Sequence, residues 1–462
     1  MIFSNSDICP FPIVLAAAYN NLKGENIPFE IKWLADLETF HLFFNEGLTG
    51  TFPDGIKYLS NLQSVGIQYC SFSGTLPSWL GEATQLTALA LGSNKFKGFV
   101  PSSISKLDQL KFLALDNMFL VGKMDLFQPL HSLETLYLEK NTLSGNLYGV
   151  LENWPNLVEI DISDNMFSGT IPNVIVNHQS LAVADLHSNY FIGSFPEDIF
   201  QNTVLELLAV DSNQLAGTIP DRIGFLSNIR HLDLSLNRLT GLIPDTLGAL
   251  TELVYLSTYG NSFTPSSLID MSQLTNLVNL MMKANNMYGT IPSWIGALSN
   301  LQLVDFGSNS LTGSIPSEIG LLTALNRLML NRNMLSGSLP LQMSALTNLN
   351  VLLLDSNSIS GDAEMICARD KVKPQFFIAD CYPGRNGQHP KLTCLCCTTC
   401  CADNDQSCNN QAWTANFDPT WDYGVVRKSY TFSLDNAPVF YNSAGGGVDG
   451  TSLSANQVDT VP

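Results

Sequence analysis

One phrase repeats through three-quarters of this 462-residue chain and sets narrow limits on its fold. Each copy holds an apolar pair, an asparagine and then a glycine, four residues later in most copies. The glycines are Gly24, Gly50, Gly74, Gly98, Gly122, Gly145, Gly169, Gly193, Gly217, Gly241, Gly289, Gly313, Gly337 and Gly361, and Pro265 takes their place once. Twelve of the fourteen intervals are 24 residues long. A fixed period in this range indicates a solenoid, whose units bury their apolar faces by stacking on one another.

Residues 226–244 show the local structure that we expect of each copy. The segment from His231 to Ser235 alternates, which predicts a short strand with Leu232 and Leu234 pointing into the core. Side by side, about fifteen such strands would form a parallel sheet. The next residue of the phrase is Asn237, whose side-chain amide can satisfy backbone groups of adjacent coils.

This asparagine recurs in thirteen of the fifteen copies and predicts a structural ladder along the array. Its members are Asn20, Asn45, Asn94, Asn141, Asn165, Asn189, Asn213, Asn237, Asn261, Asn285, Asn309, Asn333 and Asn357. Cys70 and Met118 occupy the position in the other two copies, where we expect the ladder to be weaker.

The full phrase, LxxLxxLxLxxNxLxGxIPxxLGxLxxL, resembles the plant-type leucine-rich repeat. The Ile-Pro step or a close variant appears in eleven copies, as in Ile243-Pro244. The resemblance implies an α/β-type repeat solenoid: a curved horseshoe with a parallel β-sheet on its concave side and mostly irregular or 3₁₀ structure on its convex side. It also implies binding outside the cell or at its surface. Plant relatives usually begin with a cysteine-paired cap, and none precedes Asn20, so we expect the cap and any signal or anchor segment to be missing from this sequence.

Composition divides the chain into four parts. We assign residues 1–361 to the repeat array and residues 362–408 to a cysteine-rich C-terminal cap. The aromatic-rich tail, residues 409–441, is expected to pack on the cap or to dock a partner. Residues 442–462 contain Gly445, Gly446 and Gly447 among polar residues, which predicts a flexible end.

Eight of the ten cysteines lie close together after the last repeat: Cys367, Cys381, Cys394, Cys396, Cys397, Cys400, Cys401 and Cys408. Such a group predicts disulfide bonds, which require an oxidising compartment, although the sequence does not define their pairing. Zinc is the alternative, because Cys-x-x-Cys spacing also suits that metal. Adjacent cysteines and the lack of paired histidines favour disulfides. The cluster resembles the C-terminal caps of leucine-rich-repeat proteins of diatoms and related algae.

Charge and motifs exclude several classes of function. The chain carries 41 acidic and 22 basic residues, a net charge of −19, which argues against nucleic-acid partners. It has no apolar run long enough to span a membrane. Hydrolase, phosphate-loop, zinc-protease and kinase motifs are absent, so we expect no enzyme activity, no cofactor and no metal. His41, His187 and His231 fall on predicted strand faces, where we expect them to be solvated.

The outward strand positions of repeats six to ten form an acidic stripe. We predict that the ligand-binding residues are Tyr137, Glu139, Asp161, Asp164, Asp185, His187, Asp211 and Asp233. The stripe is flanked by an aromatic group (His41, Phe43, Phe44 and Tyr69) and by a basic group (Lys283, Arg327 and Arg332). Like charges on neighbouring strands cost stability unless something neutralises them, which favours a cationic peptide, polyamine or protein loop as ligand. Aspartate also belongs to the ordinary repeat phrase, so a purely structural role is the alternative.

We therefore expect a non-enzymatic extracellular or cell-surface recognition module that binds a protein, peptide or glycan through its concave face. The alternative is a structural component of an extracellular matrix or filament, with the array as a spacer and the aromatic tail as a connector. Binding to ice or to a polysaccharide surface would need a regular column of Thr, Ser or Asn, which the concave positions lack. The sequence does not define the oligomeric state.

Overall fold

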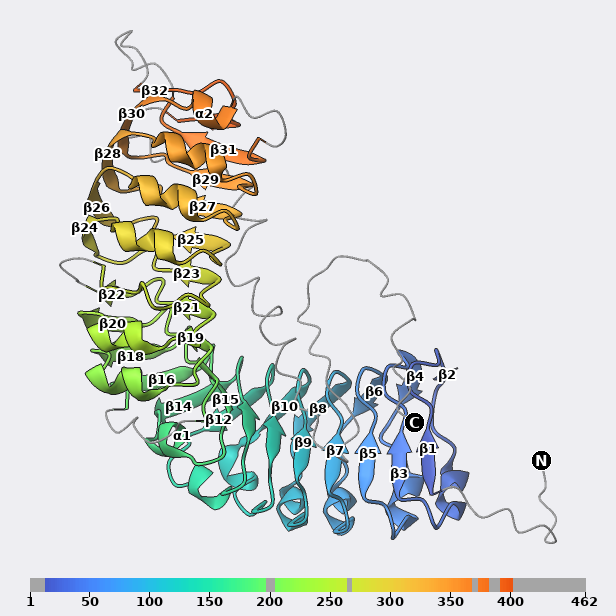
Figure 1. Cartoon of the computed structure of the whole chain (residues 1–462). Helices are drawn as coiled ribbons and strands as arrows, with labels where there is room; N and C mark the ends of the chain where they lie inside the picture. The colour runs from blue at the N-terminus through green and yellow to red at the C-terminus, as the bar shows by residue number, and fades with distance from the viewer. Residues whose placement is uncertain (1–12, 197–203, 264–267, 368–372, 382–390, 402–462) are drawn as a thin grey trace, which may run out of the picture. The chain divides into compact units, whose positions relative to one another are not determined.

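The structure is a computed structural model that describes residues 13–196, 204–263, 268–367, 373–381 and 391–401. The chain divides into two compact units, residues 1–408 and 409–462. The second unit lies outside the described residues, so the aromatic-rich tail and the flexible end do as well. In the first unit each repeat forms one coil, and successive coils stack on one another in sequence order (Figure 1).

The main sheet takes one short strand from each coil, and every strand pairs in parallel with those of the coils before and after it, as predicted. Within the described residues it has seventeen strands. They are β1 (Val14–Ala16), β3 (Thr39–His41), β5 (Ser64–Gly66), β7 (Ala88–Ala90), β9 (Phe112–Ala114), β11 (Thr135–Tyr137), β13 (Glu159–Asp161), β15 (Val183–Asp185), β17 (Leu207–Ala209), β19 (His231–Asp233), β21 (Tyr255–Ser257), β23 (Asn279–Met281), β25 (Leu303–Asp305), β27 (Arg327–Met329), β29 (Val351–Leu353), β31 (Phe376–Ala379) and β33 (Thr399–Cys400). Leu232 in β19 and Leu234 after it are fully buried, as the alternation predicted.

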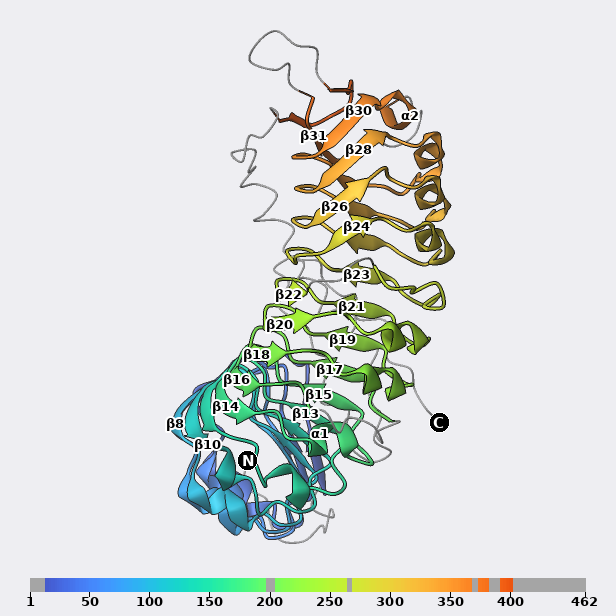
Figure 2. The ribbon, with the colours of Figure 1, turned by 90° about the vertical axis from the view of Figure 1, so that its left-hand side faces the viewer.

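A second set of strands lies across the core from the main sheet and is described in two parts (Figure 2). The first part holds β2 (Lys23–Gly24), β4 (Gly47–Gly50), β6 (Ser71–Gly74), β8 (Lys95–Phe99), β10 (Phe119–Lys123), β12 (Thr142–Gly145), β14 (Met166–Thr170), β16 (Tyr190–Gly193), β18 (Gln214–Gly217), β20 (Arg238–Gly241) and β22 (Ser262–Phe263). The other holds β24 (Tyr288–Thr290), β26 (Ser310–Gly313), β28 (Met334–Ser338), β30 (Ser358–Asp362) and β32 (Leu392–Thr393). We call both parts together the second sheet.

Most coils close with a short 3₁₀ turn that follows the proline of the phrase, as the family resemblance implied. These turns are η1 (Phe29–Trp33), η2 (Asp54–Tyr58), η3 (Ser78–Glu82), η4 (Ser102–Lys106), η5 (Met124–Leu126), η6 (Leu151–Asn153), η7 (Asp221–Phe225), η8 (Asp245–Ala249), η9 (Ser293–Ala297), η10 (Ser317–Leu321) and η11 (Leu341–Ala345). Single α-helical turns stand at the same place in two coils, α1 (Val174–Asn177) and α2 (Glu364–Cys367). None of the helices in the described ranges has the length and apolarity needed to cross a membrane.

The buried asparagines connect the two sheets. The Nδ2 of Asn237 donates to the carbonyls of Val210 in the preceding coil (2.9 Å), Leu234 (3.3 Å) and Ser235 (3.0 Å). Its Oδ1 accepts the backbone N–H of Leu215, in β18 of the second sheet, at 2.9 Å. One side chain thus satisfies four backbone groups that are too deep for water to reach.

Cys70 replaces the ladder asparagine in the third coil without losing every bond. Its thiol donates to the carbonyls of Leu42 (3.3 Å) and Gln68 (3.6 Å), which are positions that an asparagine amide reaches in other coils. The backbone N–H of Leu48, which has no asparagine oxygen to meet, bonds instead to the carbonyl of Asn45 at 2.9 Å. The thiol is therefore a partial substitute for the amide.

The cysteine-rich segment continues the coils beyond the last 24-residue repeat. β31 and β33 extend the main sheet, and β32 pairs with β30 of the second sheet. The carboxylate of Asp380 accepts the backbone N–H groups of Ser356 and Asn357, both at 2.9 Å. The equivalent N–H groups one coil earlier bond to backbone carbonyls, so the Asp380 side chain replaces main-chain acceptors at this end.

Disulfides hold these last coils together, as expected from the cysteine content. Cys367 bonds to Cys396, Cys381 to Cys400 and Cys394 to Cys397, and Cys401 is disulfide-bonded as well. Cys408 lies outside the described residues. The sulfurs of Cys367, Cys394 and Cys396 are close enough together to hold a metal, but each is part of a disulfide and does not provide a thiolate.

Candidate binding surface on the main sheet

The eight predicted binding residues end strands between β11 and β19 or lie in the turns that follow them. Those in the strands follow a fully buried residue such as Leu136 or Ile160, so the alternation points them outward. In the strand register Tyr137 lies beside Asp161, and Asp161 lies beside Asp185. Asp233 is separated from Asp185 by Ala209 of β17. The 24-residue period therefore brings these residues into adjacent columns, although they are spread over about a hundred residues of sequence.

Outward position does not leave these side chains exposed. Six of them are at most 8 % exposed: Tyr137, Glu139, Asp161, Asp185, Asp211 and Asp233. The side chains of Asp164 and His187 are 38 % and 16 % exposed. The stripe is therefore a buried row of carboxylates with a partly open edge.

The aspartates are buried because they close the turns that follow their own strands. The Oδ1 of Asp161 accepts the backbone N–H of Ser163 at 3.0 Å and its hydroxyl at 2.6 Å. The Oδ1 of Asp233 accepts the N–H of Ser235 at 2.9 Å, and its Oδ2 accepts the hydroxyl of Tyr255 at 3.1 Å. Each carboxylate thus has a structural role in the turn that follows its strand.

His187 lies between two carboxylates of the stripe. Its Nδ1 is 2.5 Å from Oδ1 of Asp185, and its Nε2 is 3.6 Å from Oδ2 of Asp164. Burial alone would lower the pKa of His187, but these carboxylates outweigh it and raise this pKa well above its usual 6.5. The histidine is therefore a fixed positive charge within the stripe at neutral pH.

The negative charge of the stripe acts on the buried tyrosines beside it. Burial, followed by Glu159 and Glu139, raises the pKa of Tyr137 well above 10. Burial and then the charges of Asp233 and Asp211 do the same to the pKa of Tyr255. Both phenols therefore stay neutral.

The expectation that the strand-face histidines are solvated is wrong for two of the three. His41 is 4 % exposed, and its Nε2 is 2.9 Å from the hydroxyl of Ser64. Burial lowers the pKa of His41 to about 4, so this ring is neutral. His231 is 1 % exposed and stacks on Tyr255 with ring centroids 4.1 Å apart. Neighbouring strands stand close enough that flat rings cover one another.

The aromatic group at the N-terminal side forms a continuous stack. The ring of Phe44 lies 4.4 Å from that of Tyr19 and 4.3 Å from that of Tyr69, with nearly parallel planes. All three residues have a positive φ and directly precede the ladder position. Sequence reasoning grouped Phe44 with Tyr69 and missed Tyr19, although the shared position before the asparagine column could have revealed it.

The structure adds residues at both ends of the acidic stripe that the sequence did not place there. Asp116, 2 % exposed, occupies the column of Glu139 one coil earlier and accepts the hydroxyl of Ser93 at 3.3 Å. At the other side, Lys283 lies 5.6 Å from the ring of Tyr259. Burial raises the pKa of Asp305 to about 6, and the charge of Lys283 partly opposes this rise. The acidic stripe thus begins earlier than predicted, and a lysine and a buried carboxyl follow it.

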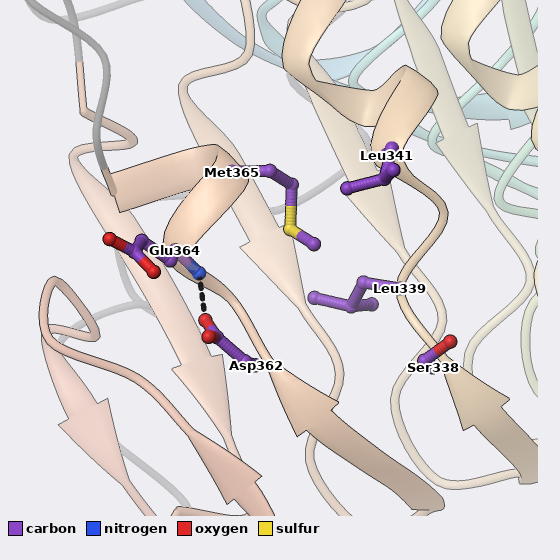
Figure 3. Close-up of a pocket in the computed structure, with 6 residues that line it drawn as sticks. All are labelled: Ser338, Leu339, Leu341, Asp362, Glu364 and Met365. Carbon is purple, nitrogen blue, oxygen red and sulfur yellow. Dashed lines mark hydrogen bonds between the residues drawn. The ribbon is translucent and has the colours of Figure 1, made fainter.

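A shallow open pocket lies several coils away, near the C-terminal end of the array. Its lining includes the apolar side chains of Leu339, Leu341 and Met365 (Figure 3). Asp362 accepts the backbone N–H of Glu364 at its rim. The predicted binding residues and this pocket share no residue, so the pocket is a separate feature.

Comparisons with known proteins agree with this architecture. The family model described as Leucine Rich Repeat matches residues 156–178, 228–250 and 300–322. None of the curated proteins compared matches the sequence.

Solved structures resemble the chain over most of its length. The ectodomain of the receptor kinase GASSHO1/SCHENGEN3 from Arabidopsis thaliana, in complex with CASPARIAN STRIP INTEGRITY FACTOR 2, is 31 % identical over 78 % of this chain and 43 % of its own, with a TM-score of 0.71. The Arabidopsis receptor kinase HAESA, in complex with the peptide hormone IDA and the co-receptor SERK1, is 27 % identical over 85 % of this chain and 71 % of its own, with a TM-score of 0.68. A leucine-rich-repeat protein of Leptospira interrogans is 29 % identical over 73 % of this chain and 77 % of its own, with a TM-score of 0.51.

The chain spans less than half of the GASSHO1/SCHENGEN3 chain that it matches. The repeat phrase, the two sheets of parallel strands, the 3₁₀ turns and these comparisons agree with one another. The protein carries leucine-rich repeats and folds as a repeat solenoid like the ectodomains of plant receptors.

Proposed function

We propose that this protein is a non-enzymatic recognition module, outside the cell or at its surface, that binds a cationic peptide or protein segment over β11 to β19. Its structural neighbours include receptor ectodomains in complex with peptide ligands. The matching family model describes a repeat, and no enzyme family is indicated. The disulfides of the last coils suit an oxidising extracellular compartment.

The observation that carries the proposal is the row of carboxylates on adjacent strands. Asp161 and Asp185 are register partners in neighbouring strands, which lie about 4.8 Å apart. Like charges at such spacing repel each other, and the repulsion is stronger in a buried setting than in water. A cationic segment bound over this face would lower that repulsion. Ligand binding should therefore increase the stability of the sheet.

The partly exposed edge of the stripe offers the point of contact. Asp164 is more open than the other carboxylates, and it directly precedes the ladder residue Asn165. Burial raises the pKa of Asp164, but its bond with His187 offsets this and holds the pKa below the usual 3.8. Asp164 is therefore ionised at neutral pH. A lysine or arginine of the ligand would contact Asp164 directly. The buried carboxylates nearby would add to the electrostatic attraction.

Charge removal without loss of hydrogen-bond acceptors tests the proposal. Asn in place of Asp keeps an oxygen that can accept the turn N–H, so we would change Asp161, Asp185, Asp211 and Asp233 to Asn together. Binding of a fluorescein-labelled lysine decapeptide is measured by anisotropy at several salt concentrations. We expect the affinity to fall about tenfold or more and the salt dependence to decrease.

The matched control changes four exposed acidic residues of the convex turns by the same total charge. These are Asp108→Asn, Asp221→Asn, Asp245→Asn and Glu252→Gln. The control should bind like the unmodified protein. Equal binding by all three proteins, or equal loss in both variants, would overturn the proposal that the stripe binds the ligand.

A further inference from the structure

Two neighbouring strands of the second sheet carry exposed lysines and exposed apolar side chains together. In six coils of the described ranges the residue before the repeat glycine is a Ser or Thr whose hydroxyl donates to the glycine carbonyl of the preceding coil. Examples are Ser73 to Gly50 at 3.3 Å and Thr240 to Gly217 at 3.3 Å. In β8 and β10 the outward residues are instead lysine and apolar. They are Lys95, Lys97, Phe99, Phe119, Val121 and Lys123, which we call the lysine–phenylalanine patch.

The strand register arranges the patch with an apolar centre and charged ends. Lys97 lies beside Phe119, and Phe99 lies beside Val121. Lys95 precedes this centre on β8, whereas Lys123 follows it on β10. Lys97 and Lys123 are thus four residues apart along the strand direction, about 13 Å. Figure 2 shows β8 and β10 as neighbours in the second sheet.

These side chains are exposed, in contrast to the main-sheet carboxylates. Phe99 is 74 % exposed, Phe119 is 68 % exposed and Val121 is 38 % exposed. The three lysines are exposed too, and none forms a salt bridge with any residue in the described ranges. The neighbouring strands β6 and β12 carry small hydroxyl residues at the same positions, such as Ser73 and Ser144. The fold therefore does not require large apolar or basic groups here.

We propose that the lysine–phenylalanine patch binds an extended acidic segment of a partner protein, with an apolar side chain between two acidic ones. In an extended chain, residues four apart are separated by about 13 Å and point to the same side. A segment of the form acidic-x-apolar-x-acidic would therefore place its carboxylates near Lys97 and Lys123. Its apolar side chain would cover Phe99, Phe119 and Val121, and burial of this apolar surface would provide affinity. The charge pairs would fix the register of the segment on the patch.

A protein segment fits the patch better than an anionic membrane does. The patch is two strands wide, about 10 Å, and hydroxyl side chains flank it on both sides. The whole chain carries a net charge of −19, which would repel a broad anionic surface. A narrow acidic segment would contact three lysines directly. The acidic residues elsewhere on the protein lie farther away, where salt screens their repulsion. This site lies on a different sheet from the proposed cationic-ligand surface and selects the opposite charge.

The test uses peptides and variants taken from the repeat itself. The probe is the labelled peptide acetyl-GSEAFAESG-amide, compared with versions that carry Gln for both Glu or Ala for Phe. In the first variant Lys95→Ser, Lys97→Thr and Lys123→Thr remove the charges, and in the second Phe99→Thr, Phe119→Ser and Val121→Thr remove the apolar centre. Hydroxyl residues occupy these positions in other coils, so both variants should fold, which circular dichroism checks.

We expect the lysine variant to bind the acidic probe about tenfold more weakly, and the apolar variant to lose at least as much. The Gln and Ala peptides should bind the unmodified protein equally poorly. A control with Lys23, Lys57 and Lys106 changed to Gln should keep full affinity. Unchanged binding in both patch variants would overturn the proposal. So would patch-dependent binding to vesicles of phosphatidylcholine and phosphatidylserine (3:1) without binding to the peptide.

Discussion

The two sheets of each coil treat their outward residues in opposite ways. On the main sheet Asp161 and Asp233 are 4 % and 1 % exposed, because their carboxylates bond to the turns that follow them. On the second sheet Phe99 and Phe119 are 74 % and 68 % exposed. The same repeat thus provides one face on which polar side chains are buried by internal hydrogen bonds. On its other face, apolar side chains are exposed to solvent. A residue type alone does not tell which face will be available to a partner.

The difference also separates stability from recognition. Substitutions on the main sheet and in the ladder break internal hydrogen bonds, so they should affect folding as well as binding. Substitutions of the exposed residues on the second sheet should change binding with little effect on folding. Asn237, which bonds to backbone groups of both sheets, lies on the stability side of this separation.

Asn237→Ala should produce a large loss of stability. It leaves the buried N–H of Leu215 and the carbonyls of Val210, Leu234 and Ser235 without the side chain that serves them. We expect the free energy of unfolding of this region to fall by about 3 kcal/mol, measured by urea denaturation. The control is Asn300→Ala, which removes one exposed bond to the carbonyl of Thr275 and should cost less than about 1 kcal/mol. Equal losses would contradict the special role of the ladder.

Asp305→Asn should change the pH dependence of stability. Burial raises the pKa of Asp305 from 3.8 to about 6, so the folded state holds the proton more tightly than the unfolded state does. The stabilisation is present below pH 3.8 and is lost as the pH rises to about 6. Relative to the variant, the unmodified protein should therefore lose about 2 kcal/mol between pH 4 and pH 7. Parallel stability curves for the two proteins would show that this carboxyl titrates normally.

The six hydroxyl substitutions of the lysine–phenylalanine patch should have the smallest effect on folding. The exposed side chains of Phe99 and Phe119 contribute little to the core. The free energy of unfolding, measured by urea denaturation, should therefore change by less than about 0.5 kcal/mol. A matched core change, Phe167→Ala, removes a fully buried ring and should cost about 3–5 kcal/mol. A large loss in the patch variants would mean that these side chains serve the fold.

Much of the fold could be predicted because the period determines both stacking and strand direction. Leu232 marks the inward face of a strand, and Asn237 marks the turn between the two sheets. The continuation of the sheet into β31 could not be predicted, since Phe376–Ala379 falls outside the 24-residue spacing. The pairing of Cys367 with Cys396 likewise depends on how α2 meets the segment after β32.

The sequence predicted which residues of the candidate site are neighbours but not how deeply they are buried. Register placed Asp161 beside Asp185, because parallel strands from equal repeats align in columns. The burial of these groups depends on side-chain rotation toward residues such as Ser163, which the spacing does not encode. The exposed patch on β8 and β10 was not predicted, because the residue before the repeat glycine varies among hydroxyl, basic and apolar types and the repeat phrase does not show which of them are exposed.

The most direct test of the central claim is to map where a cationic ligand contacts the protein. A lysine decapeptide with a central benzoylphenylalanine is bound, photolysed and located by mass spectrometry. We expect cross-links within residues 135–139, 159–164, 183–188, 207–212 and 231–235, and we expect them to be lost in the variant with four aspartates changed to asparagine. Cross-links concentrated on the convex turns, or unchanged in that variant, would contradict it.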